Sequence, residues 1–180
     1  MHIPTQDLVY LGLLVGILLV FRSARRSFLV LSILILPGTI CHELCHLFVG
    51  ALFRGRPVKF TVIPKREGRG LVLGSVAFAH IRWYNAFFIG MAPVLLLPAA
   101  YGILVWRLGQ NPVLGWGEAL GLFFTANLIF AAMPSWPDLR IAVRSPIGWL
   151  LLIGAVVYGW GHVHADKLVP QLFHKVIQAP

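Results

Sequence analysis

Five long apolar stretches dominate the sequence and limit what the chain can fold into. Of its 180 residues, 58% are hydrophobic and only 12% are charged, about half the charged fraction of an ordinary soluble domain. About 20 apolar residues in a helix cross the hydrocarbon core of a bilayer. The sequence therefore predicts a single membrane-embedded domain over residues 1–180, all-α and polytopic, with about five transmembrane helices. The stretches cover residues 8–21, 28–53, about 83–106, 119–134 and 146–161.

Basic residues lie between these stretches. The chain has 15 Lys and Arg against 6 Asp and Glu, a net charge of +9. A nucleic-acid-binding domain would gather such charges on one polar face. Here they form short clusters beside apolar runs, as in the loops of membrane proteins. We therefore expect the lipid bilayer, and no nucleic acid, as a partner.

The first apolar stretch, residues 8–21, is followed by Arg22, Arg25 and Arg26. As a helix it covers about 21 Å, so a full crossing needs neighbouring residues or a thinner bilayer. A cleaved signal peptide is the alternative, but its positive charge would precede the apolar residues. We interpret the stretch as a first membrane helix that is retained.

Residues 54–82 have a different composition. Two segments rich in β-branched and aromatic residues, 58–63 and 71–78, flank a turn that contains Pro and Gly. They predict a small membrane-associated β-hairpin at about residues 56–80, between the second and third membrane helices.

The second apolar stretch contains His42-Glu43-Leu44-Cys45-His46. Pro37 and Gly38 are expected to kink the helix before it, and Thr39 to cap the new start. Residues four apart lie on one helix face, so both imidazoles can reach one Zn²⁺, with Glu43 beside the metal-bound water.

Ionisable residues at membrane depth usually mark function. The alternative is a set of polar residues that hydrogen-bond between helices. Cys41 and Cys45 do not share the histidine face of the helix. We interpret the two cysteines as small packing residues.

A catalytic zinc site normally has three protein ligands. Among the few remaining acids, Asp138 follows an apolar stretch and lies beside two prolines that would let its carboxylate turn inward. The alternative is a loop aspartate paired with Arg140 or Arg144. Glu67 lies among basic hairpin residues and is interpreted as a solvated turn charge.

Together these motifs resemble the site-2 protease family of intramembrane zinc metalloproteases. The resemblance covers about residues 28–140, the expected catalytic core, and includes Asn127 and the segment Pro134-Ser135-Trp136-Pro137-Asp138. In the family the aspartate is usually followed by Gly and lies closer to the asparagine, so this chain resembles a divergent, minimal member.

The resemblance implies one Zn²⁺ per chain, bound by His42, His46 and Asp138. It implies that Glu43 is the general base of a zinc metalloendopeptidase that hydrolyses membrane-anchored protein substrates. Asn127 would make a polar contact with substrate or with the active-site backbone.

A substrate must be extended for attack, and the 56–80 hairpin offers an edge strand for it to pair with. A hairpin that only plugs the lipid-facing side of the site is an equal alternative. The competing function is a non-enzymatic metal-binding membrane protein, either a transporter or an inactive relative that binds membrane helices. Such a protein would not need Glu43.

The positive-inside rule gives the expected orientation. With a cytoplasmic hairpin, 9 basic residues lie inside and 6 outside. We expect a multi-pass protein of a prokaryotic cell membrane whose metal site opens toward the cytoplasm.

Overall fold

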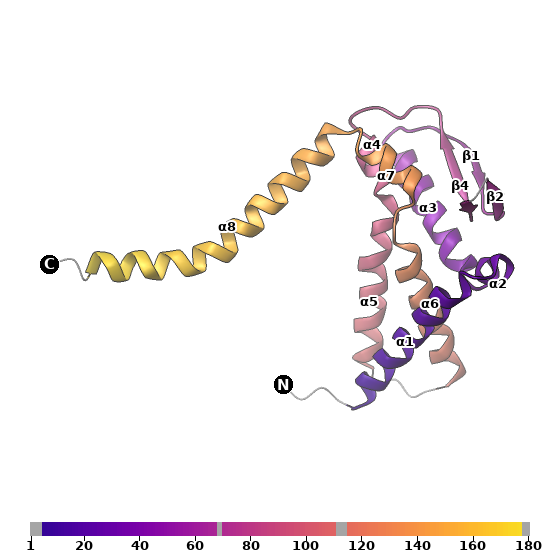
Figure 1. Ribbon diagram of the computed structural model, residues 1–180, viewed down its shortest axis with the longest axis horizontal. Helices are drawn as coiled ribbons and strands as arrows, with labels where there is room; N and C mark the ends of the chain where they lie inside the picture. Colours follow the sequence, from indigo (N-terminus) through magenta and orange to yellow (C-terminus); the bar gives the residue numbers. More distant parts are fainter. Residues whose placement is uncertain (1–4, 68–69, 111–114, 178–180) are drawn as a thin grey trace.

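The computed structural model describes the backbone at residues 5–67, 70–110 and 115–177, and side chains at 5–64, 72–110 and 115–161. The described chain is mostly helical, with a small antiparallel β-structure after the third helix (Figure 1). The helices are α1 (Thr5–Ala24), α2 (Phe28–Leu34), α3 (Leu36–Leu52), α4 (Ala86–Gly90), the 3-10 helix η1 (Ala92–Leu95), α5 (Leu96–Leu108), α6 (Trp116–Ala131), α7 (Trp136–Ala142) and α8 (Pro146–Ile177). The strands are β1 (Pro57–Thr61), β2 (Lys65–Glu67), β3 (Gly70–Val72) and β4 (Ser75–Phe78).

One helix, α1, is long and apolar enough to cross a membrane by itself. It extends the predicted stretch at both ends. Two helix pairs pass the same test together but are bent, α2 with α3 by 67° and α6 with α7 by 53°. Counting each bent pair as one span gives up to three candidate spans within the described residues. The predicted total of about five remains a prediction.

The bend between α2 and α3 confirms the expected kink. Pro37 occupies the first turn of α3, where a missing N–H is tolerated. The expected cap at Thr39 is wrong, because α3 already begins at Leu36. Thr39 instead donates its hydroxyl to the Ile35 carbonyl at 3.1 Å.

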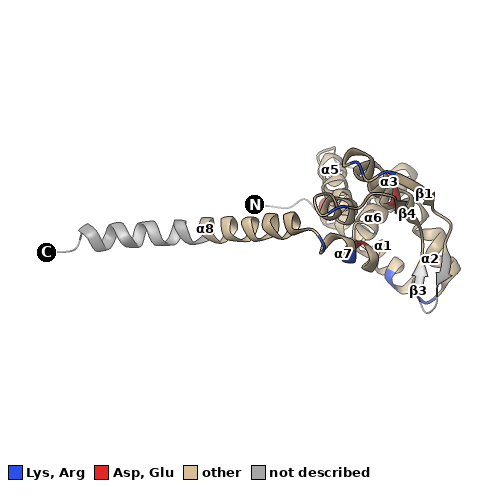
Figure 2. Cartoon of the chain, turned by 90° about the horizontal axis from the view of Figure 1, so that it is seen from above, with Lys and Arg blue, Asp and Glu red and all other residues tan. Residues whose placement is uncertain are grey.

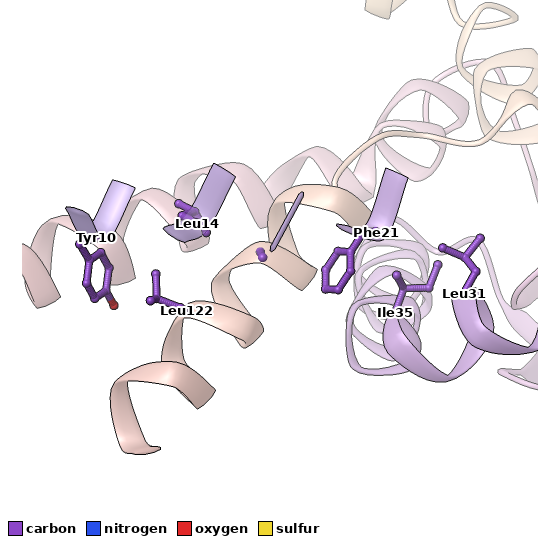
Figure 3. Packing of buried hydrophobic residues seen from close by; sticks show 7 residues of the cluster. Tyr10, Leu14, Phe21, Leu31, Ile35 and Leu122 are labelled. Carbon is purple, nitrogen blue, oxygen red and sulfur yellow. The ribbon is translucent and has the colours of Figure 1, made fainter. Parts of the chain in front are cut away.

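Helix α6 is central, and α1, α3 and α5 all pack against it. A buried apolar cluster joins α1 and α2 to α6 (Figure 3). Within it, the Phe21 ring lies edge-on to the rings of Phe123 and Phe130, with centroids 5.7 and 5.6 Å apart. Edge-to-face pairs stabilise beyond their buried area. The cluster therefore holds α6, which packs against α3, in place against α1 and α2. Its buried residues are Tyr10, Leu14, Phe21, Leu31, Ile35, Leu122 and Ala126.

The predicted hairpin is confirmed as antiparallel pairs of β1 with β4 and of β2 with β3. The ladder breaks between the pairs Thr61–Ser75 and Lys65–Val72, where residues 62–64 lie opposite residues 73–74. The side chain of Glu67 lies outside the described residues. Both β1 and β4 pack against α3, so the ladder break lies beside this helix.

The later apolar stretches are less regular than expected. Residues 83–106 are divided among α4, η1 and α5, with Pro93 inside η1. Helix α8 continues well past the predicted end at residue 161 and leads away from the other helices (Figure 1). Residues 146–161 of α8, whose side chains are described, include no charged residue (Figure 2).

Candidate metal centre

The HExxH segment lies on α3, and both histidines point toward the same place. The Nε2 atoms of His42 and His46 are 3.3 Å apart. His46 and Glu43 are buried, and His42 is partly buried. The predicted sharing of one helix face is therefore confirmed.

Asp138 joins the histidines from α7. Its Oδ1 lies 3.2 Å from His46 Nε2, and its Oδ2 lies 3.5 Å from His42 Nε2. The Arg140 guanidinium instead lies 5.8 Å from the Trp136 ring centroid. Asp138 forms no ion pair with an arginine in the described part of the chain. The structure thus brings together the three side chains predicted as ligands.

Ser135 holds the Asp138 carboxylate through a capping box at the start of α7. Both the backbone N–H and the hydroxyl of Ser135 donate to Asp138 Oδ2, at 2.7 and 2.5 Å. The Asp138 N–H donates to Ser135 Oγ at 3.4 Å. The sequence analysis missed this role, although Ser three residues before an acid at a helix start is a capping signal.

Backbone carbonyls orient the two imidazoles. His42 Nδ1 lies 2.7 Å from the Ala131 carbonyl oxygen, and His46 Nδ1 lies 2.8 Å from that of Ile89. Both carbonyls belong to the last turn of a helix, where carbonyls have no partner within the helix. Because a carbonyl only accepts, each Nδ1 is the donor, and each Nε2 points toward Asp138, where a neutral ring would offer its lone pair to a metal ion.

The donor set fits a metal ion. Two imidazole Nε2 atoms and a carboxylate converge, with ligand atoms within 4.8 Å of one another, and a cation between them could bind all three. Tetrahedral Zn²⁺ with Zn–N bonds of 2.0–2.1 Å places two nitrogens about 3.3–3.4 Å apart. The observed spacing of 3.3 Å agrees with this value. His42, His46 and Asp138 can therefore hold a metal ion with zinc-like geometry.

A cavity of about 400 Å³ opens beside these three residues. Glu43 lines it from α3, and Leu73, Gly74 and Ser75 line it from the ladder break of the hairpin. A Cβ on Gly74 would lie 2.7 Å from both Cγ and Oε1 of Glu43. The hairpin therefore approaches the Glu43 carboxylate as closely as only a glycine allows.

Asn127 lies within α6 and is fully buried. Its Oδ1 accepts from the Gly38 N–H at 3.0 Å, and its Nδ2 donates to the Phe123 carbonyl at 3.1 Å. A Cβ on Gly38 would come within 2.6 Å of the Asn127 carbonyl oxygen, so the two helices touch here. The contact of Asn127 with α3, the helix that carries His42 and His46, is observed. Asn127 is not among the residues that line the cavity, and its contact with substrate stays a prediction.

The two cysteines are free and partly buried, on the side of α3 that meets α5 and α6. They pack against the apolar cluster of Leu96, Ala100, Leu128 and Ala132. Their interpretation as packing residues agrees with this position.

Comparison with known proteins finds no relative of this chain. No family model matches the sequence, and no curated protein or solved structure matches it either.

Proposed function

We propose that this protein is an intramembrane zinc metalloendopeptidase, similar to the site-2 proteases, which hydrolyses peptide bonds of membrane-anchored proteins. One observation carries the proposal. His42, His46 and Asp138 converge with ligand-like spacing, and Glu43 lies in the same cavity. This combination of two histidines, an acid and a neighbouring carboxylate is the one that metal-assisted hydrolysis requires.

A bound Zn²⁺ would lower the pKa of its water and polarise the scissile carbonyl. The chain's own residues supply the remaining steps. The Glu43 carboxylate lines the same cavity as His42, His46 and Asp138, a position from which it would accept a proton from the attacking water. Glu43 then delivers that proton to the leaving amine. The Ala131 and Ile89 carbonyls keep the imidazoles aimed at the reaction centre.

The membrane setting determines how a substrate is presented. A helical segment buries its amides in hydrogen bonds, so it must become extended before attack. In the described part of the chain, strand β4 is paired on one edge only, with β1, and its residues Ser75, Val76 and Phe78 line the cavity. An extended substrate segment would pair along the other edge of β4 and pass the metal. The alternative role of the hairpin, a plug between site and lipid, predicts that loosening β4 raises cleavage.

The apolar surface supports a multi-pass location. Large hydrophobic side chains are exposed along α1, α2, α5 and α8, where water would be unfavourable. The hairpin carries basic residues that favour a cytoplasmic position.

The decisive experiment uses the full chain purified in detergent. Zinc is measured per chain for wild type and for the variants Glu43→Gln and Asp138→Ala, and cleavage of a panel of single-span membrane proteins is followed by mass spectrometry. Glu43→Gln should keep the metal and lose cleavage by at least about 100-fold, since it removes the general base. Asp138→Ala should lose the metal.

The outcomes separate the alternatives. Equal cleavage by wild type and Glu43→Gln would refute the mechanism. Zinc bound by both, with no cleavage of any substrate by wild type, would favour the non-enzymatic metal-binding protein. Full zinc content in Asp138→Ala would assign the third ligand to another residue.

A further inference from the structure

A second cavity, of about 550 Å³, lies where α3 ends and the hairpin begins. It is separate from the metal centre and shares no lining residue with it. Three of its lining residues are arginines and none is acidic. The lining residues are Ala51, Arg54, Arg56, Pro57, His80, Arg82 and Tyr84.

A buried asparagine holds the walls of this arginine pocket together. Asn85 is fully buried, and its Nδ2 donates to the carbonyls of Phe53 and His80, each at 3.1 Å. Its Oδ1 accepts from the Arg82 N–H at 2.7 Å. One side chain thus fixes the end of α3, the segment after β4 and the backbone of Arg82. The pocket is therefore a built part of the fold.

The backbone of two of the arginines is in an unusual conformation. Arg54 and Arg56 have φ angles of 57° and 51°, in the left-handed region that favours glycine. Both positions are nevertheless occupied by arginine. The Ala79 N–H donates to the Arg56 carbonyl at 3.0 Å and holds the backbone between α3 and β1 in this conformation. Residues held in sparsely populated conformations cluster at functional sites. The strain points to a use for these two side chains.

No acidic side chain of the described residues neutralises the positive charge of the pocket. Arg54, Arg56 and Arg82 are exposed, and none forms an ion pair or a cation–π contact within the described chain. Guanidinium groups bind phosphate through paired N–H donors. A phosphate-bearing anion is the ligand that three arginines and no acid around one pocket fit.

An apolar stripe leads from the pocket along α3. Leu44, Phe48 and Leu52 are 46%, 66% and 65% exposed and recur every four residues on one helix face, next to Ala51 of the pocket wall. Trp83 is 60% exposed beside Arg82, as expected of an aromatic side chain at a membrane interface. A polar head and an apolar tail in this arrangement correspond to a phospholipid.

We propose that the arginine pocket binds the phosphate headgroup of an anionic phospholipid, whose acyl chains lie along Leu44, Phe48 and Leu52. The proposal rests on the membrane location that the proposed function assumes. It does not depend on peptidase activity. The bound lipid would fix the level of the membrane surface at the start of the hairpin.

The test uses the delipidated full chain in a nonionic detergent. Dioleoyl phosphatidylglycerol or dioleoyl phosphatidylcholine is added, and bound lipid per chain is counted by native mass spectrometry. Wild type should prefer phosphatidylglycerol, and added salt should weaken that preference. A basic residue near an anionic lipid surface contributes about fivefold in affinity, so Arg54→Gln, Arg56→Gln and Arg82→Gln combined should weaken binding roughly 100-fold.

The matched control removes three exposed arginines elsewhere, through Arg22→Gln, Arg26→Gln and Arg144→Gln. This control should keep the preference, as should Glu43→Gln, whose loss of cleavage concerns only the proposed function. Equal binding of both lipids by wild type would overturn the proposal even if the triple pocket variant failed to fold. So would equal weakening in pocket and control variants. Complete displacement of the lipid by inorganic phosphate at an equal concentration would also overturn it, because the site would then take a free anion.

Discussion

Replacing Gly74 with alanine tests the contact between the hairpin and the Glu43 carboxylate. The backbone angle of Gly74 is one that alanine adopts, so the obstacle is space alone. The new Cβ would lie 2.7 Å from Glu43 Oε1, whereas ordinary contact begins at 3.4 Å, so one of the two must move by about 0.7 Å. The three nearest atoms all belong to Glu43, which leaves the metal ligands undisturbed.

The expected result is a loss of activity without a loss of metal. A misplacement of about 1 Å at a reacting group can reduce the rate about 100-fold, so Gly74→Ala should lower kcat/KM by about 10- to 100-fold. The measurements are cleavage of a single-span substrate at several concentrations and zinc content per chain. Wild-type and variant proteins should contain the same amount of zinc.

Gly121→Ala is the matched control, since a Cβ at this position in α6 meets no atom within 4 Å. It should cleave at the wild-type rate. The reasoning would be refuted if Gly74→Ala cleaved as fast as the control, or if it lost zinc together with activity. The second result would mean that the hairpin supports the ligands themselves.

Two further substitutions test the residues that support the site. Ser135→Ala removes the hydroxyl that donates to Asp138 Oδ2 and should weaken zinc binding about 10- to 100-fold, measured by competition with a chelating dye. Ser135→Thr, which keeps a hydroxyl, should retain most of the affinity, and equal weakening in both would contradict the capping role. Asn127→Ala leaves the Gly38 N–H buried without its acceptor and should lower the free energy of unfolding by about 1–3 kcal/mol, seen as a lower Tm in detergent. An unchanged Tm would show that this contact does not hold the two helices together.

The sequence predicted the ligand cluster because its parts obey short-range rules. Four-residue spacing places His42 and His46 on one face wherever a helix forms. Asp138 was found by elimination in a chain with few acids. That it reaches both imidazoles depends on the packing of α6 and α7 against α3 and α4, which no local pattern specifies.

Other features could not be predicted because they depend on contacts between distant segments. The carbonyls that orient the histidines come from residues 131 and 89. Because every residue has a backbone carbonyl, the sequence does not show which ones contact a histidine. In the sequence, Gly74 looks like a glycine that merely interrupts a strand. Its close contact with Glu43 becomes visible only when the hairpin is placed beside α3. The break in the ladder was also missed, because strand propensity does not report register.

The end of α6 limits where a substrate of the proposed peptidase could enter. Within one short segment, Asn127 holds α3 at Gly38, the Ala131 carbonyl aims His42, and the chain then turns to present Asp138. Opening a passage between α3 and α6 would therefore separate the His42 imidazole from its orienting carbonyl and take apart the candidate metal centre. Among the described residues, the hairpin supplies no hydrogen bond to His42, His46 or Asp138, and its closest approach to α3 is that of Gly74 to the Glu43 carboxylate. A substrate of the proposed peptidase would therefore enter from the hairpin side, where the wall can move while His42, His46 and Asp138 stay together.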